Sequence, residues 1–272
     1  PSVAIAQDNQ TPQSTKQPSG IEDHAWAKFG IGSWKRVRIS KEVFDANGKL
    51  ESVSIQEGKT TLIAVKGDRF RLKQEVIVEV AGKRFPAATQ EIERGLYNEK
   101  VGQKVSRRRL RNGKVIICQR EYPAQVHEII VSDQYSRRVS EVYYSTEVGP
   151  FILRSNTVCT DKSGKQTNYE ATVEVLAIDM PHRVLTEVKP TAYIKTVLTQ
   201  GKFTTVTLEV SCLEVPGHIV AHTAKKVGPE GQLTERSTLE LLDYEVVSKK
   251  EGPRGLGRQR LLGKRRPRGN PR

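Results

Sequence analysis

Long hydrophobic runs are missing from this sequence of 272 residues. No apolar stretch approaches the ~18 residues that a helix needs to cross a bilayer, so no membrane-spanning helix is predicted. A single Met and an aromatic content of 6% give no basis for a Met-lined or aromatic-caged site. The hydrophobic content of 36% is low, but it suffices for a core when each strand is apolar on one face only.

Cysteine is also scarce. Cys118, Cys159 and Cys212 are far apart, and the sequence has no C-x-x-C motif and no Cys/His cluster. A structural zinc site is therefore not predicted, and at most one disulfide can form. Because free cysteine is among the most buried residue types, we expect three small buried side chains.

Positive charge is in excess but unevenly placed. The formal net charge is +14, and residues 249–272 carry ten Lys/Arg against one acid, which leaves +5 for the rest of the chain. Residues 249–272 are also rich in Gly and Pro, so we predict a disordered basic tail. The strong basicity is therefore mostly a property of this tail.

The opening residues give a hint about compartment. Ala4-Ile5-Ala6, followed by four polar residues, is typical of the A-x-A cleavage site of a secretory signal. Residues 1–20 otherwise lack any apolar period and are predicted to be a disordered leader, the remnant of a signal peptide plus a linker. This pattern predicts export to the bacterial periplasm, the cell envelope or the extracellular space.

Strand signals dominate residues 21–248, which we predict to be a single antiparallel β domain. Alternating runs rich in Val, Ile, Thr and Leu are separated by turn candidates. These are Asn47-Gly48, Glu57-Gly58, Gly67-Asp68, Asn112-Gly113, Ser163-Gly164 and Gln200-Gly201. One or two helical turns are predicted within 87–100, interrupted by Gly95, and another within 21–28. Short strand spacing without amphipathic helices favours a meander over a βαβ fold.

Internal repetition is the most informative pattern. Three segments begin with a Gly, run out as a strand, turn at a second Gly and return, and they lie near 30–66, 148–178 and 215–247. Their return strands share a Thr-apolar-Glu-apolar core, at 172–175, 207–210 and 238–241. With a two-residue period, Thr and Glu point to one face and the aliphatic residues to the other. The fold class predicted is all-β: a large curved antiparallel meander, half-barrel or open barrel, built from repeated strand–turn–strand units.

These Gly-led strands, Gly turns and Thr-apolar-Glu-apolar returns resemble those of uncharacterised exported bacterial β-rich proteins. More distantly they are similar to the lipoprotein-carrier superfamily. That resemblance covers roughly Phe29 to Val247 and implies a strongly curved sheet forming an incomplete barrel around a hydrophobic cavity. It departs from the carriers in one respect, because the long amphipathic helices that line or lid their cavity are not found.

No catalytic motif is found. His218 and His222 have the spacing of a helical metal pair, but this segment alternates like a strand, where four residues place the two Cα atoms roughly 13 Å apart. We therefore interpret them as two solvent-side histidines. A G-x-S-x-G elbow and a complete dinucleotide fingerprint are both missing. The sequence predicts no cofactor, no metal site and no enzyme activity.

Two sets of candidate binding residues follow. The apolar residues of the repeat strands are expected to line either a cavity or a closed core on the concave face of the sheet: Trp34, Phe151, Leu153, Val173, Val175, Leu208 and Val210. Basic clusters are candidates for polyanion contact: Arg107, Arg109, Arg111, Lys264, Arg265, Arg266 and Arg268. The segment 107–114 is expected to form one arm and the turn of a hairpin at a sheet edge, where charge discourages pairing with other edges.

Two functions remain open at this point. The first is an exported, non-enzymatic binding or carrier protein that holds a hydrophobic ligand, such as a lipid or a lipoprotein acyl chain. The second is an envelope-associated protein that binds an anionic envelope component through its basic tail. Specific nucleic-acid binding is not predicted, because no stacking aromatics are interleaved with the arginines.

Overall fold

The computed structural model describes residues 23–80 and 82–249. The predicted leader, 1–20, lies outside the described residues, and so does all of the predicted basic tail except Lys249. Within the described residues, no helix is long and apolar enough to cross a membrane.

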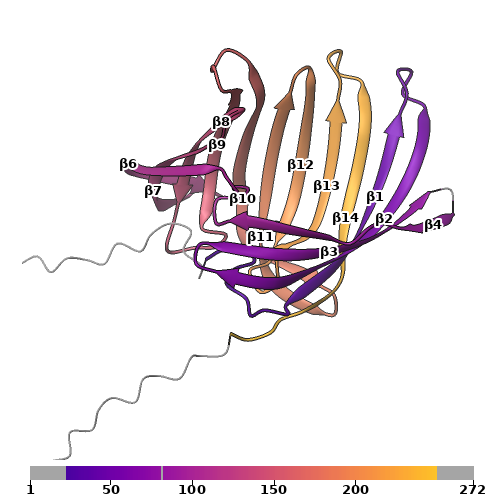
Figure 1. Ribbon diagram of the computed structural model, residues 1–272, viewed down its shortest axis with the longest axis horizontal. Helices are drawn as coiled ribbons and strands as arrows, with labels where there is room; N and C mark the ends of the chain where they lie inside the picture. The colour runs from indigo at the N-terminus through magenta and orange to yellow at the C-terminus, as the bar shows by residue number, and fades with distance from the viewer. Residues whose placement is uncertain (1–22, 81, 250–272) are drawn as a thin grey trace, which may run out of the picture.

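Fourteen strands make up a single antiparallel sheet (Figure 1). Their bounds are β1 Trp34–Phe44, β2 Leu50–Lys66, β3 Arg69–Val80, β4 Lys83–Pro86, β5 Gln90–Gly95, β6 Lys104–Ile117, β7 Arg120–Ser132, β8 Ser136–Tyr144, β9 Ile152–Asp161, β10 Thr167–Val184, β11 Glu187–Gln200, β12 Phe203–Ser211, β13 Ile219–Val227 and β14 Leu233–Glu245.

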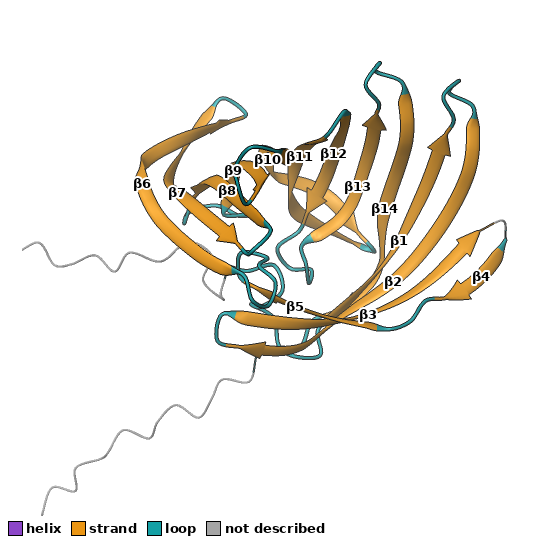
Figure 2. Cartoon of the chain, turned by 45° about the horizontal axis from the view of Figure 1, so that its top comes forward, coloured by secondary structure: helices purple, strands orange, loops and turns teal. Residues whose placement is uncertain are grey.

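The strand order is that of a meander in which the last strand also pairs with the first. Strands β6 to β14 pair in sequence, β14 then pairs with β1, and β1, β2 and β3 lead on to β4 and β5. The sheet is strongly curved but stays open, with β6 at one edge and β4 and β5 at the other (Figure 2). This confirms the predicted all-β, open antiparallel architecture.

The helical turns predicted within 87–100 are wrong, because Gln90–Gly95 forms β5. Ile92 of β5 pairs with Leu72 of β3, which gives its apolar side chain a cross-strand partner. Tertiary pairing therefore outweighs the helical propensity of this segment. The segment from residue 23 to 28 forms hydrogen-bonded turns, with the Lys28 amide donating to the His24 carbonyl, and no helix is present among the described residues.

Four of the six predicted glycine turns connect strands, and two do not. Gly48, Gly67, Gly164 and Gly201 each have positive φ between paired strands. Gly58 instead lies inside β2, paired with Val37 and Val76, and Gly113 lies inside β6. A Cβ at Gly113 would lie 2.9 Å from Val126, so close packing of neighbouring strands explains this glycine.

The β6–β7 hairpin turns at Cys118-Gln119 instead of Asn112-Gly113. Both turn residues have positive φ, 47° and 66°, as a two-residue hairpin turn requires. Segment 107–114 therefore belongs wholly to β6 and contains no turn. The prediction that it lies at a sheet edge is confirmed, because β6 ends the sheet.

The segment from Asp23 to Ser33, here called the N-terminal plug, packs across the sheet. The Tyr144 hydroxyl donates to Asp23 Oδ2 at 2.6 Å, and the Gly217 amide donates to the Ala25 carbonyl at 2.7 Å. Ala27 is fully buried in a cluster with Leu62, Phe70 and Leu72. The plug therefore ties together strands that are far apart in the sheet order.

Gly217 offers a test of this packing. Its φ is +74°, and an added Cβ would lie 2.8 Å from the Trp26 ring of the plug. Gly231 has a similar φ of +79° with nothing within 4 Å, so it serves as a matched control. We expect Gly231→Ala to cost about 1–2 kcal/mol of stability through the backbone alone, and Gly217→Ala to cost about 1–3 kcal/mol more through overpacking.

Urea unfolding monitored by tryptophan fluorescence measures both variants. Equal losses of stability for Gly217→Ala and Gly231→Ala would show that the contact between the plug and the loop before β13 does not stabilise the fold.

Candidate ligand cavity on the concave face

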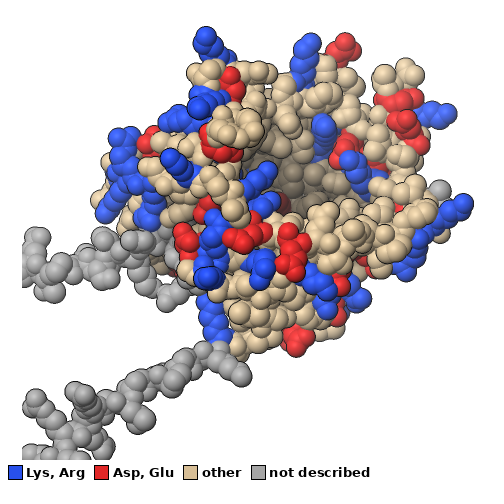
Figure 3. Space-filling view, in the orientation of Figure 1, with Lys and Arg blue, Asp and Glu red and all other residues tan. Residues whose placement is uncertain are grey.

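A cavity of about 480 Å³ lies between the plug and the inner face of the sheet. Its lining comes from the plug, from β3, from the β5–β6 connection and from β7, β8, β9 and β10. The lining residues are His24, Ala25, Trp26, Phe70, Leu96, Tyr97, Asn98, Ile129, Arg138, Ser140, Val142, Ile152, Thr157, Tyr169 and Ala171. The space-filling view shows the concave side of the sheet hollowed, with charged side chains around the rim of the hollow (Figure 3).

Strand order shows that the cavity lies on the concave face. Phe70 of β3 and Ser140 of β8 both line it, although these strands are near opposite ends of the sheet order. They can share a cavity only if the sheet curls until its two ends face each other. Residues that pair directly across strands share a face, so Ile129, Ser140, Thr157 and Ala171 define the inner face.

Curling leaves a gap between the edges that no strand pair closes. The β5–β6 connection fills part of it, and its Tyr97 carbonyl accepts a hydrogen bond from Arg138 Nη2 of β8 at 2.7 Å. Gln103 donates to Asp133 after β7 at 2.7 Å. The Arg138–Tyr97 bond joins the two sides of the cavity without a backbone ladder, whereas the Gln103–Asp133 bond continues the pairing of β6 with β7 on one side.

The lining is apolar with a few polar groups. Phe70, Leu96, Ile129, Val142 and Ile152 contribute hydrocarbon surface. The polar groups include the Arg138 guanidinium and the hydroxyls of Ser140, Thr157 and Tyr169, and the Ser140 and Thr157 hydroxyls bond to each other at 2.9 Å. An apolar cavity with a small number of placed polar groups is the usual form of a small-molecule site.

His24 is held neutral in the lining. Its Nδ1 accepts hydrogen bonds from the Trp26 and Ala27 amides, each at 3.1 Å, and its ring packs against Phe70 in a tilted arrangement with 4.5 Å between centroids. Burial lowers the pKa of His24 to about 4. An unprotonated Nδ1 is what these two amide bonds require, because a protonated ring nitrogen accepts none.

Of the predicted apolar residues, Leu153, Val173 and Val175 come together. Val173 and Val175 alternate with Ala171 along β10 and therefore share its inner face. Leu153 and Val175 are buried in one cluster with Ile194, and Val173 packs against it. This cluster adjoins the cavity lining, but none of the three residues lines the cavity itself.

Trp34, Leu208 and Val210 do not lie on the concave face, which corrects the prediction for them. Glu209 pairs with Ile194, and Ile194 pairs with Val175, so Glu209 faces inward and its neighbours Leu208 and Val210 face outward. Leu208 is exposed, whereas Val210 is buried in a separate cluster with Val184, Cys212, Val215 and Val220.

Trp34 and Phe151 are also outside the cavity. Trp34 donates from Nε1 to Glu245 at 2.8 Å and lies under the Lys59 ammonium, on the same outer face as the Arg38–Glu57 ion pair. Phe151 precedes β9 with a φ of +67°, and its ring lies 6.4 Å from that of Tyr144.

The basic candidates divide between the two faces of β6. Arg107 and Arg109 pair with Ile129 and His127 on the inner face, and a bulge then turns Arg111 outward, where it binds Glu141 at 3.1 Å. Lys264, Arg265, Arg266 and Arg268 lie outside the described residues. Polyanion binding by these residues stays a prediction.

The sequence reasoning missed most of the cavity lining. Ile129, Val142 and Arg138 lie on β7 and β8, outside the three repeat segments on which it concentrated. The period-two alternation of β7, with Ile129 and Val131 on one face, was a usable signal for this wall. Phe70 and the plug had no such signal, because their proximity depends on the curvature of the whole sheet.

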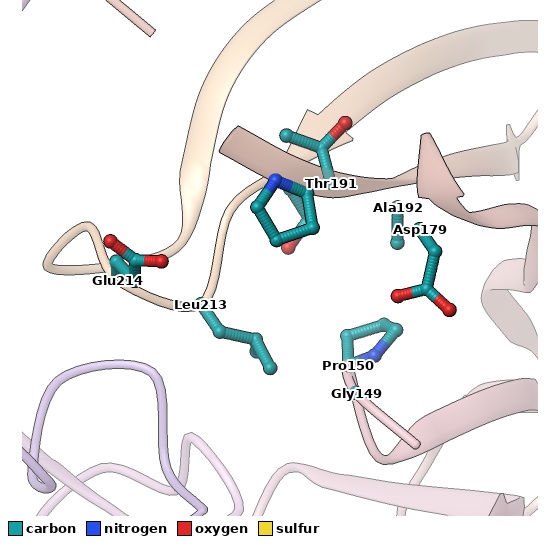
Figure 4. A pocket seen from close by; sticks show the side chains of 9 residues that line it. Gly149, Pro150, Asp179, Thr191, Ala192, Leu213 and Glu214 are labelled. Carbon is teal, nitrogen blue, oxygen red and sulfur yellow. The ribbon is translucent and has the colours of Figure 1, made fainter. Parts of the chain in front are cut away.

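A smaller cavity of about 190 Å³ lies elsewhere, beside Gly149-Pro150 and β11 (Figure 4). Asp179 and Glu214 bring carboxylates to it, and Lys189 binds Glu214 at 2.6 Å. Across residues 23–80 and 82–249, no three His, Cys, Asp or Glu side chains gather as a metal site would need.

Two expectations about single residues are corrected. Cys118 is exposed in the β6–β7 turn, whereas Cys159 and Cys212 are buried, and all three thiols are free. His218 is buried just before β13 instead of facing solvent, and its Nε2 has no hydrogen-bond partner among the described residues. Burial lowers the pKa of His218 to about 3.

Comparison with known proteins gives structural neighbours only. No protein-family model and no curated protein sequence matches the chain. A protein from Bacteroides fragilis, inferred to be exported and with a YmcC-like fold, is similar at a TM-score of 0.32 and 9% identity, over 80% of this chain and 97% of that one. A protein from Parabacteroides distasonis, inferred to be a lipoprotein, is similar at a TM-score of 0.33 and 9% identity, over 79% of this chain and 96% of that one.

The buried histidines predict acid sensitivity. A histidine has a pKa of about 6.5 in the unfolded chain, whereas His24 in the folded chain has a pKa of about 4. Between about pH 6.5 and about pH 4, His24 is therefore protonated in the unfolded state and neutral in the folded state, so unfolding takes up a proton. We expect the free energy of unfolding to fall as the pH drops through this range.

The variant His24→Asn keeps a side-chain acceptor for the two amides but cannot titrate. We expect it to take up about one proton fewer on unfolding near pH 5, measured by denaturant unfolding at a series of pH values. A slope identical to that of the wild type would contradict the neutral, buried state of His24.

Proposed function

We propose that this chain is an exported bacterial binding or carrier protein that holds an apolar ligand in the cavity between the plug and the inner face of the sheet. The observation that carries the proposal is the cavity itself. Its volume of about 480 Å³ falls within the roughly 300–1,000 Å³ of small-molecule sites, and its lining is mainly hydrocarbon.

The architecture supports binding over catalysis. A single-layer sheet exposes an apolar inner face that must be covered by something, and here the plug covers only part of it. Each methylene of a bound chain removed from water contributes about 0.8 kcal/mol. An acyl chain would therefore complete the burial that the plug begins.

Export is supported by the sequence at Ala4-Ile5-Ala6, which is typical of a signal cleavage site. A carrier for an apolar ligand suits an aqueous compartment outside the cytoplasm, because such a ligand needs shielding from water there.

Ala171 and Thr172 provide a matched test of the cavity. Ala171 lines it, whereas Thr172 is the next residue of β10 and is exposed on the opposite face. We expect Ala171→Trp to fill the cavity and to weaken binding of the neutral fluorophore phenylnaphthylamine at least tenfold. Thr172→Trp should bind it as the wild type does, and unfolding curves should show that both variants fold.

Extraction of the purified wild-type protein with organic solvent and mass spectrometry gives a second measurement. We expect co-purified lipid in the wild type and in Thr172→Trp, and little in Ala171→Trp. A clean wild-type extract, together with equal fluorophore binding by both variants, would overturn the proposed function.

A further inference from the structure

Arg138 places a positive charge in the wall of a mainly apolar cavity. It lies on the inner face of β8, between Val131 of β7 and Cys159 of β9, and it is one of the lining residues. A cation held in such surroundings is costly unless a partner compensates it. The identity of that partner bears on what the cavity binds.

The contacts of Arg138 within the protein are to uncharged groups. Its Nη2 donates to the Tyr97 carbonyl at 2.7 Å, and its charge acts on the nearby Tyr169 hydroxyl. Burial raises the pKa of Tyr169, so this hydroxyl stays neutral near pH 7. A guanidinium has five N–H donors, so donors remain for a further acceptor.

The carboxylates of the neighbouring strands are engaged on the other face of the sheet, while on the cavity side Asp23 accepts a hydrogen bond from Tyr144 and Glu99 accepts one from the Tyr97 amide. Glu128 of β7 binds Arg108 at 3.0 Å, and Glu141 of β8 binds Arg111 at 3.1 Å. Both glutamates belong to the outward-facing set, opposite to Arg138. Across the described residues, no ion pair links Arg138 to a carboxylate of the chain.

The rest of this wall is electropositive as well. Arg107 and Arg109 pair with Ile129 and His127 on the inner face. Burial, and then the charges of Arg107 and Arg109, lower the pKa of His127 to about 4. Arg107 and Arg109 therefore add positive charge on the same face of the sheet as Arg138, in partly buried surroundings that screen charge less than water does.

We propose that Arg138 binds the anionic end group of an amphiphilic ligand, a carboxylate or a phosphate monoester, while the hydrocarbon chain lies against Phe70, Ile129 and Val142. This inference rests on the proposed function and adds the chemical class of the ligand. A planar guanidinium binds either oxyanion through two parallel hydrogen bonds, which is why arginine suits this position.

Three ligands with the same chain test the head group. Dodecanoate, dodecyl phosphate and the neutral dodecanol are each titrated to displace phenylnaphthylamine from the full-length protein. We expect at least one of the two anions to bind about 10- to 100-fold more tightly than dodecanol, as charge-assisted hydrogen bonds allow. The comparison of carboxylate with phosphate distinguishes a fatty acid from a phosphorylated lipid.

The variant Arg138→Gln should remove this preference, so that the anions bind it no more tightly than dodecanol binds the same variant. Arg137→Gln is the matched control, because Arg137 is the preceding residue and is exposed on the outer face. It should keep the preference for the anion.

The outcomes separate the two proposals. If dodecanol binds wild-type protein as tightly as both anions do, or if the anion preference survives Arg138→Gln, the head-group inference is wrong and the apolar cavity stands. If none of the three ligands displaces the fluorophore and Ala171→Trp changes nothing, the proposed function fails, and the inference fails with it. The wild-type comparison alone decides the matter if Arg138→Gln does not fold.

Discussion

A sheet of a single layer has no second layer to cover its apolar face, and this constraint shapes the whole molecule. The N-terminal plug supplies the missing cover over part of the inner face, through Ala27, Phe29 and Trp26. Phe70 and Tyr144 belong to opposite ends of the strand order, yet both contact this segment. Curvature and plug therefore depend on each other, and the cavity is the part of the concave face that the plug does not fill.

The open edges are joined by side chains instead of a backbone ladder. The buried Glu99 carboxylate accepts a hydrogen bond from the Tyr97 amide at 2.9 Å. It occupies the space that a side chain at position 95 would need, so a glycine fits at this position. At the other edge, β6 carries several cations along its length. Like charges on an edge strand discourage pairing with another sheet, which helps the sheet to stay open beside the cavity.

The sequence predicted the fold class well because two-residue alternation is a local signal. It predicted the faces of the strands poorly. Val173 in β10 and Leu239 in β14 point inward as the repeat pattern suggests, but the β12 copy is inverted and directs Glu209 inward. The pattern shows that a strand has two faces without showing which one is concave. On β12 the outer face carries its own buried cluster around Val210, so apolar residues suit that side too.

Register also decides the charge of the cavity wall. Because side chains alternate, a slip of one residue moves a whole set to the opposite face. The bulge between Arg109 and Arg111 is such a slip, and it lets Arg111 reach Glu141 on the outside. In the sequence, Arg137 and Arg138 look equivalent, yet strand pairing exposes one and places the other in the cavity. The acids of β7 and β8 thus neutralise outer arginines, whereas no ion pair links Arg138 to a carboxylate among the described residues. This arrangement suits a ligand that brings its own negative charge.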